Sequence, residues 1–441
     1  MLKRFLFVLP VLFMAQNALA LDLSLNKAVD LIVEESQDVK KAEANLKKAQ
    51  ASLDAVNANR WFKISGSASY MNLINVEDPS KPYVYDLPPQ IGGIIAKVTE
   101  NQLNVTEIPI PDNIFMAGVS ITQPIYTFGK IGNAVDSVKS AIKMSESGKE
   151  LAVREVRYSA ADIYWTAKMT DEIVKITKKD LNEAYKAKKR LTSAGRANRS
   201  NLVKIESDIA TKEINLSDAE FNRDTAYRML KILAGIDINE EIVLTEEFPK
   251  TFTALDSTEL KSTPQWDILN QQIAMYEEKA KSERSGALPT LAATASYNYF
   301  AMDEDFDNMF NGLSSQAAYW GLSLQVPIFS GGLNRANATI EAMNAEAARQ
   351  DLDKSKKMLS EEYTRAIDQY NHLRGNLAKL ETARDLAAKA YSFSSDRFAA
   401  GQTSAVELAE VSSGLYQLDM ALLNAKYKIL MSAETVKKLG D

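Results

Sequence analysis

The chain has 441 residues, of which 58 are acidic and 52 are Lys or Arg, for a formal net charge of -6; it contains one histidine and no cysteine. The lack of cysteine excludes disulfides, thiolate metal sites, a cysteine nucleophile and an acylated lipobox, so we expect no lipid anchor. The acidic balance offers no electrostatic basis for binding nucleic acid.

Residues 1–20 have the three-part form of a secretory signal peptide. Lys3 and Arg4 precede an apolar run over residues 5–15, and Ala18-Leu19-Ala20 forms a small-x-small cleavage site. The run is too short to span a bilayer as a helix. We therefore expect the mature chain to begin at Leu21. No later stretch resembles a transmembrane helix, so entry into a membrane would require a β-barrel.

Residues 24–59 predict an amphipathic helix, and after it the apolar period changes from 3.6 to 2. The shorter period occurs four times and predicts strands near 62–72, 114–124, 290–300 and 317–327. Each strand has one apolar face and one small or polar face. Such a sheet fits a soluble core or a membrane barrel, and alternation alone favours the soluble sheet.

The connections between the strands differ in length. Residues 72–113 hold six prolines and predict a long exposed loop, whereas the acidic residues 303–307 mark a shorter one. The other strand ends lead into long helices: 130–193 with a return over 200–233, and a second hairpin over 331–439 that breaks at Ala399-Ala400-Gly401. The first arm of the second hairpin covers about 70 residues, or on the order of 100 Å.

The chain is also duplicated. Gly118, Ser120, Pro124 and Gly129 recur in the same order and spacing as Gly321, Ser323, Pro327 and Gly332. We therefore divide the mature chain into a first repeat over 21–235, an equatorial insert over 236–261 that bears a short strand at Ile242-Val243-Leu244, and a second repeat over 262–441. Each repeat reads helix, strand, strand, helix, helix.

The sequence resembles the outer membrane efflux protein family, the TolC-like exit ducts. The resemblance rests on Leu23-Ser24-Leu25, on Leu288-Pro289, on the stretch 326–332 and on Arg397-Phe398-Ala399-Ala400-Gly401. It implies a mainly α protein with a membrane β-barrel. In such proteins a homotrimer forms a twelve-stranded barrel, which continues into a long periplasmic α-helical barrel. It also implies residence in the bacterial outer membrane, with outer-membrane lipid, a periplasmic adaptor and an inner-membrane transporter as partners.

Oligomerisation has independent support, because four strands leave two open edges that cannot face lipid unpaired. The number of chains comes from the resemblance alone. The leading interpretation is a passive duct of a tripartite efflux or type I secretion system. The alternatives are a periplasmic adaptor or a coiled-coil scaffold protein.

Residues for catalysis are not apparent. The single histidine, His372, excludes two-histidine zinc motifs, and the chain has neither a phosphate-binding Gly-rich loop nor a Gly-x-Ser-x-Gly elbow. We expect no enzyme activity, no cofactor and no metal site.

The tip of the second hairpin carries the candidate functional residues. Ser404 and Glu407 have capping-box spacing, and Glu410 lies one turn further on the same face. The resemblance implies that Glu407 and Glu410 form an acidic gate and selectivity ring, which would attract cations and be blocked by them.

The residues assigned to the tip and to adaptor docking are Gly195, Asn201, Arg397, Phe398, Gly401 and Ser404. Two of them depart from the family pattern. Asn201 stands where an acid aligns, and Phe398 stands where family members often have a tyrosine that locks the closed tip. A hydrogen bond between these two side chains is impossible, so closure must use packing or other polar partners.

Overall fold

The computed structural model describes residues 21–74, 83–86, 107–110, 112–193, 199–256, 259–308, 310–311 and 313–440. The expected signal peptide and Gly195 lie outside these ranges. The chain divides into two compact units. One comprises Met1–Lys47, Lys143–Asn270 and Arg349–Asp441, and the other Lys48–Ile142 and Gln271–Ala348.

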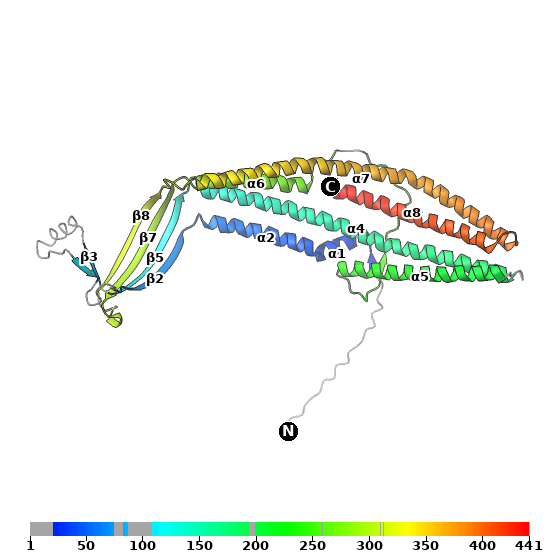
Figure 1. Ribbon diagram of the computed structural model, residues 1–441, viewed down its shortest axis with the longest axis horizontal. Coiled ribbons are helices and arrows are strands. Elements are labelled where there is room, and N and C mark those ends of the chain that lie inside the picture. The colour runs from blue at the N-terminus through cyan, green and yellow to red at the C-terminus, as the bar shows by residue number, and fades with distance from the viewer. Residues whose placement is uncertain are drawn as a thin grey trace, which may run out of the picture. The chain divides into compact units, whose positions relative to one another are not determined.

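The second unit contains a four-stranded antiparallel sheet in the order β2-β5-β7-β8 (Figure 1). Its strands are β2 (Lys63–Asn72), β5 (Asn113–Tyr126), β7 (Thr290–Asp303) and β8 (Leu313–Gln325). All four coincide with the stretches of alternating residues. They are long for strands, and among the described residues β2 and β8 each have one edge without a partner strand.

The register places residues of the same kind in rows across the sheet. One row is Ser65, Ser120, Ser296 and Tyr319, and the next is Ile64, Ile121, Ala295 and Trp320. Because neighbouring rows point to opposite faces, one face is small and polar and the other is apolar. The apolar side chains Ile64, Trp320, Leu322 and Leu324 are exposed. This chain therefore leaves an apolar sheet face without a core to cover it.

The segment predicted as an unstructured loop contains a separate antiparallel pair. β3 (Tyr83–Asp86) pairs with β4 (Glu107–Ile110), so the prediction was wrong for these residues. Pro109 lies in β4, which suits an edge strand because proline donates no ladder hydrogen bond. The remainder of the predicted loop lies largely outside the described residues.

The first predicted helix is two helices, α1 (Leu25–Glu35) and α2 (Gln37–Ala58), separated by Ser36. Ser36 has a ψ of 125°, outside the helical region, and its hydroxyl accepts a hydrogen bond from the Val39 amide at 3.4 Å. Ser36 thus acts as the N-cap of α2. The apolar stripe continues across the break, which is why periodicity alone predicted a single helix.

The long helices are α4 (Lys130–Ser193), α5 (Arg199–Leu233), α6 (Pro264–Ser285), α7 (Leu333–Ala399) and α8 (Ala405–Gly440). Helices α4 and α5 form the first hairpin, and α7 and α8 form the second (Figure 1). Among the described helices, none has both the length and the apolarity needed to cross a membrane.

The main core of the first unit surrounds Tyr164 of α4. β1 (Leu21–Leu23) pairs in parallel with β6 (Ile242–Leu244), so the strand of the insert joins the start of the described chain. The Tyr164 hydroxyl donates to the Leu23 carbonyl at 3.1 Å and accepts from the Glu246 amide at 3.2 Å. The buried neighbours are mostly alanine and aliphatic residues, which allow the helices to approach closely.

Candidate functional site

The turn between α7 and α8 ends α7 with a Schellman motif. Gly401 has a φ of 76°, and its amide bonds to the Phe398 carbonyl at 3.0 Å. The Gln402 amide bonds to the Arg397 carbonyl at 2.8 Å. This pair of bonds satisfies the last carbonyls of α7 and requires a left-handed residue, which glycine supplies without a Cβ penalty.

Ser404 is the N-cap of α8. Its hydroxyl accepts from the Glu407 amide at 3.2 Å, which is the first half of the predicted capping box. The Glu407 carboxylate accepts from the Thr403 hydroxyl and lies 3.9 Å from the Arg397 guanidinium. Glu407 therefore closes the turn through Thr403 and stands close enough to Arg397 for a weak, solvent-screened attraction.

Glu407 and Glu410 are both exposed at the start of α8. Glu410 has no hydrogen-bond or ion-pair partner in the described part of the chain. The buried residues of this turn, Ala405 and Leu408, occupy the other side of the helix. The two carboxylates thus share an exposed helix face at the hairpin tip, and two carboxylates on one face can attract cations.

Phe398 links the two hairpins by packing. Its side chain is 5% exposed and belongs to an apolar cluster that draws on both hairpins. The cluster contains Leu181, Ala184, Ala187 and Leu191 of α4, Ile205 and Ile209 of α5, and Ala405 and Leu408 of α8. The ring therefore fills the space between the hairpins.

Asn201 of α5 reaches the second hairpin. Its side-chain oxygen lies 3.5 Å from the amide of Ala405, the first residue of α8, at the outer limit of a hydrogen bond. An amide at a helix N-terminus has no partner within its own helix, so Asn201 acts as a cap supplied by the other hairpin. Asn201, Phe398, Ser404 and Glu407 thus gather around one turn, and Gly195 lies outside the described residues.

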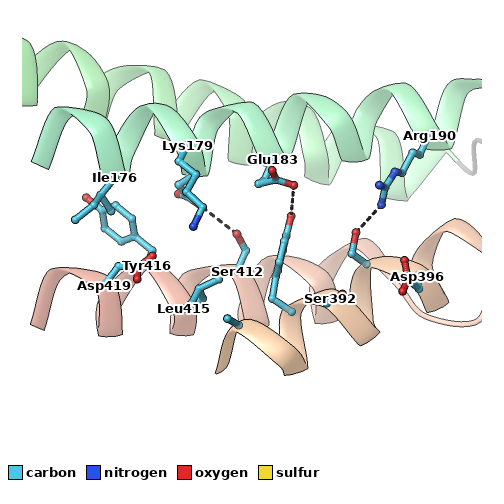
Figure 2. A pocket seen from close by; sticks show the side chains of 14 residues that line it. Ile176, Lys179, Glu183, Arg190, Ser392, Asp396, Ser412, Leu415, Tyr416 and Asp419 are labelled. Carbon is cyan, nitrogen blue, oxygen red and sulfur yellow. Dashed lines mark hydrogen bonds between the residues drawn. The ribbon is translucent and has the colours of Figure 1, made fainter. Parts of the chain in front are cut away.

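Further polar contacts join the hairpins along their length, and no pattern in the sequence predicts them. The guanidinium of Arg190 donates to Ser395 at 2.7 Å, and the Tyr391 hydroxyl donates to Glu183 at 3.3 Å. In Figure 2, Arg190 and Glu183 point from α4 toward α7, and Ser412 of α8 points back toward α4. These contacts border a cavity of about 320 Å³ between the hairpins.

A buried ion pair supports one of these contacts. Lys212 of α5 is buried and pairs with Asp180 of α4, whose other oxygen accepts from the Ser412 hydroxyl at 2.9 Å. A second carboxylate, Asp208, lies 3.9 Å from the Lys212 ammonium. Burial raises the pKa of Asp208, Lys212 opposes that rise, and the like charge of Asp180 adds to it. Asp180 of α4 therefore links three helices, because it pairs with Lys212 of α5 and accepts from Ser412 of α8.

A sequence signal for Lys212 exists. It follows Ile205 and Ile209 at helical spacing on the buried side of α5, so a lysine occupies a position where an apolar residue is expected. No such signal marks Asp180, Glu183 or Tyr391, because charged residues and tyrosines are common on the exposed faces of helices.

Among the described residues, no group of three His, Cys, Asp or Glu side chains is arranged to hold a metal ion. The exposed carboxylates at the tip can attract cations. The polar contacts and the apolar cluster between the hairpins form a seam along which the hairpins bind each other.

Comparisons with known proteins give a consistent result. The model of the family described as outer membrane efflux protein matches residues 28–235 and 258–439. Alkaline protease secretion protein AprF of Pseudomonas aeruginosa is 23% identical over 332 residues, which are 72% of this chain and 67% of AprF. Outer membrane protein TolC of Vibrio cholerae is 26% identical over 221 residues, which are 48% of this chain and 50% of TolC.

The crystal structure of the CmeC outer membrane channel of Campylobacter jejuni superposes with a TM-score of 0.75 at 20% identity, covering 94% of this chain and 85% of CmeC. At this identity the likeness shows the fold, a mainly helical protein with a sheet portion. The family match extends over both hairpins and all four strands. The chain therefore belongs to the outer membrane efflux protein family, which are transport conduits of the outer membrane and not enzymes.

Proposed function

We propose that this protein is a passive exit duct that carries substrates from an inner-membrane pump and a periplasmic adaptor to the cell exterior. Three chains would join their sheets into a twelve-stranded barrel in the outer membrane and their hairpins into a periplasmic helical barrel. The sheet carries this proposal: its apolar face is exposed, and both its outer strands have free edges. Lipid would cover that face, and strands of other copies would close the edges.

The proposed duct is built from two repeats, over residues 21–235 and 262–441, with the insert 236–261 between them. The turns that lead from β5 into α4 and from β8 into α7 support this division. Phe128 and Gly129 have φ values of 49° and 90°, and Gly331 and Gly332 have 62° and 82°. A left-handed pair at the same place in both halves is what a duplicated unit would retain, since non-glycine residues rarely adopt this conformation.

The gate of the proposed duct is the ring of Glu407 and Glu410, two carboxylates from each of three chains. The adaptor would dock on the tips, at Gly195, Asn201, Arg397, Phe398, Gly401 and Ser404. The closed state would be held by the Phe398 cluster and by the Arg190, Glu183 and Asp180 contacts between the hairpins. Opening would separate the hairpins along this seam.

Conductance in planar bilayers tests the gate. With Glu407→Gln and Glu410→Gln combined, we expect block by multivalent cations to weaken by at least about tenfold, because the ring loses its charge. The pair Glu361→Gln and Glu362→Gln, exposed on α7, removes the same charge away from the tip and should leave the block unchanged. Asn201→Ala should change it much less than the tip pair.

Two results would count against the proposal. Equal loss of block in the tip pair and in Asn201→Ala would contradict the assignment of the gate to the second hairpin. Absence of conductance in every variant, including those with loosened tips, would contradict the duct itself. Family membership favours the duct over the adaptor and scaffold alternatives.

A further inference from the structure

Four short segments join the strands of the sheet to the helices, and all four lie at the same end of the sheet (Figure 1). They are residues 59–63, 127–131, 284–290 and 326–336. The register pairs Tyr126 with Leu291 and Thr290 with Gln325, so the last residues of β5 and β8 lie beside the first residues of β7. A hydrogen bond also links the end of α6 to the second segment, because the Ser282 hydroxyl donates to the Lys130 carbonyl at 2.9 Å.

The charge of these segments is opposite to that of the protein. They contain no Asp or Glu, although the whole chain has a formal net charge of -6. They do contain Arg60, Lys63, Lys130, Arg284 and Arg335, all of them exposed. Within the described residues, none of these five cations forms an ion pair. Glu283, which precedes Arg284, accepts a hydrogen bond from the Asn337 side chain at 3.5 Å, and Glu278 pairs with Lys281 at 2.6 Å.

Large apolar side chains are exposed beside these cations. Trp61 directly follows Arg60, Phe128 lies two residues before Lys130, and Leu288 lies four residues after Arg284. Ile328 and Phe329 are 96% and 89% exposed. A soluble surface rarely presents this much apolar area together with unpaired cations. We call the four cations Arg60, Lys130, Arg284 and Arg335, with these apolar residues, the junction belt.

A surface that combines exposed aromatic residues with unpaired Lys or Arg side chains is typical of the interface of a bilayer. Aromatic rings settle at the level of the headgroups, and cations attract the phosphates of anionic lipids. Free phosphate would require the cations alone and would leave the aromatic and aliphatic side chains without a partner. The other end of the sheet has the opposite charge, with exposed Glu304, Asp305 and Asp307.

We propose that the junction belt binds the headgroups of anionic phospholipids in the membrane leaflet that adjoins the helices. This proposal rests on the proposed function, since it requires the sheet to lie in a bilayer. Lys63 is not part of the belt: it shares a row with Thr122 and Thr294 on the small polar face, and its ammonium bonds to the Asn59 side chain at 3.0 Å. Lys63 is therefore a matched control at the same end of the sheet.

Fluorescence quenching in vesicles tests the proposal with the full-length assembly. Trp61 and Trp320 are exposed, whereas Trp165 and Trp266 are buried, so Trp320→Phe leaves Trp61 as the tryptophan open to lipid. Brominated phosphatidylglycerol and brominated phosphatidylcholine are compared as quenchers. We expect brominated phosphatidylglycerol to quench Trp61 of this parent protein about fivefold or more effectively than brominated phosphatidylcholine does. One or more cations near an anionic lipid surface produce an effect of this size.

The combination Arg60→Gln, Lys130→Gln, Arg284→Gln and Arg335→Gln removes all four cations of the belt and should reduce that preference below about twofold. Lys63→Gln should retain it, and so should Arg284→Lys with Arg335→Lys, because charge and not shape attracts the phosphate. Unchanged conductance of each variant shows that the assembly is intact.

The remaining outcomes overturn the proposal. Equal quenching by the two lipids in the parent, or a preference that survives removal of all four belt cations, contradicts the belt while leaving the duct in the bilayer. Loss of the preference for phosphatidylglycerol in the variant that combines Arg284→Lys with Arg335→Lys contradicts a charge-based attraction. Absence of quenching by either lipid means that the sheet does not lie in a bilayer, and the proposed function then fails as well.

Discussion

At the scale of single residues, two phenylalanines on α7 illustrate how burial decides the importance of a side chain. Phe398 is 5% exposed within the cluster between the hairpins, whereas Phe393, little more than one turn earlier, is 69% exposed. Both have the same apolar area to contribute. Only Phe398 is surrounded by partners from the other hairpin, so it is the one that joins the two hairpins by packing.

We predict that Phe398→Ala lowers the free energy of unfolding of the tip by about 3 kcal/mol or more and increases resting conductance. The cause is the cavity left between α4, α5 and α8. Phe393→Ala should change either quantity much less. Thermal unfolding and single-channel recording of both variants check this, and a similar effect of the two substitutions would contradict the role given to the cluster.

Asp208 supplies a prediction with a defined pH dependence. Its folded pKa lies above the ordinary value near 3.8, mainly because of burial. The folded state therefore holds the proton more tightly than the unfolded chain does, and ionisation costs stability as the pH rises past the unfolded pKa. Asp208→Asn removes that cost. We expect the variant to unfold at a higher temperature than the parent at pH 7, and the difference to vanish as the pH falls toward the unfolded pKa.

The control is Asp218→Asn, which removes an exposed carboxylate from the same helix and should leave the pH profile unchanged. A variant of Asp208 that is less stable than the parent at pH 7 would mean that attraction to Lys212, 3.9 Å away, outweighs the desolvation.

At the scale of helices, the two hairpins meet along a seam of tyrosine, carboxylate and hydroxyl groups. Tyr427 of α8 donates to Asp162 of α4, and burial together with this bond raises the pKa of Tyr427 to about 12. Tyr391 forms the equivalent contact with Glu183 closer to the tip. These tyrosines stay neutral at physiological pH and remain hydrogen-bond donors to the carboxylates.

The ion pair of Lys212 and Asp180 lies within the first hairpin and supports this seam, because Asp180 also accepts from the Ser412 hydroxyl of α8. We predict that Lys212→Met destabilises the first unit by about 3–5 kcal/mol, because the Asp180 carboxylate is left buried without a cation. The double substitution Lys212→Met with Asp180→Asn should recover much of that loss. Lys186→Met, which breaks an exposed pair with Glu183, is the control and should cost about 1 kcal/mol or less. Denaturant unfolding measures all three, and a double variant no better than Lys212→Met would contradict the pairing.

At the scale of the whole molecule, the two faces of the sheet should respond differently to the same charge. Leu322 belongs to the exposed apolar face, and Ser323 follows it on the small polar face. We predict that Leu322→Arg lowers the yield of folded protein in the outer membrane, at a cost of about 2–4 kcal/mol near mid-bilayer. Ser323→Arg should be tolerated. Heat-modifiable migration of membrane fractions checks this, and equal tolerance would argue against lipid on the apolar face.

Local patterns in the sequence account for much of the architecture. Alternation marks the four long strands, and helical periodicity marks α4, α5, α7 and α8, because both patterns record which side of an element is buried. Gly401 ends α7 for an equally local reason, since its left-handed conformation closes two hydrogen bonds in its own turn. The break at Ser36 and the short strand pair in the long connection were missed, because weak local signals lay within longer patterns of another kind.

The tertiary structure decided which helix faces meet. Three contacts between residues far apart in the chain show this. Phe398 packs against α4 and α5, Asn201 caps α8, and Lys212 is buried against Asp180. Periodicity specifies the buried side of each helix but not the neighbour that buries it. The charges of Glu407 and Glu410 could be identified from the sequence alone, whereas the contacts between the two hairpins depend on how the hairpins pack against each other.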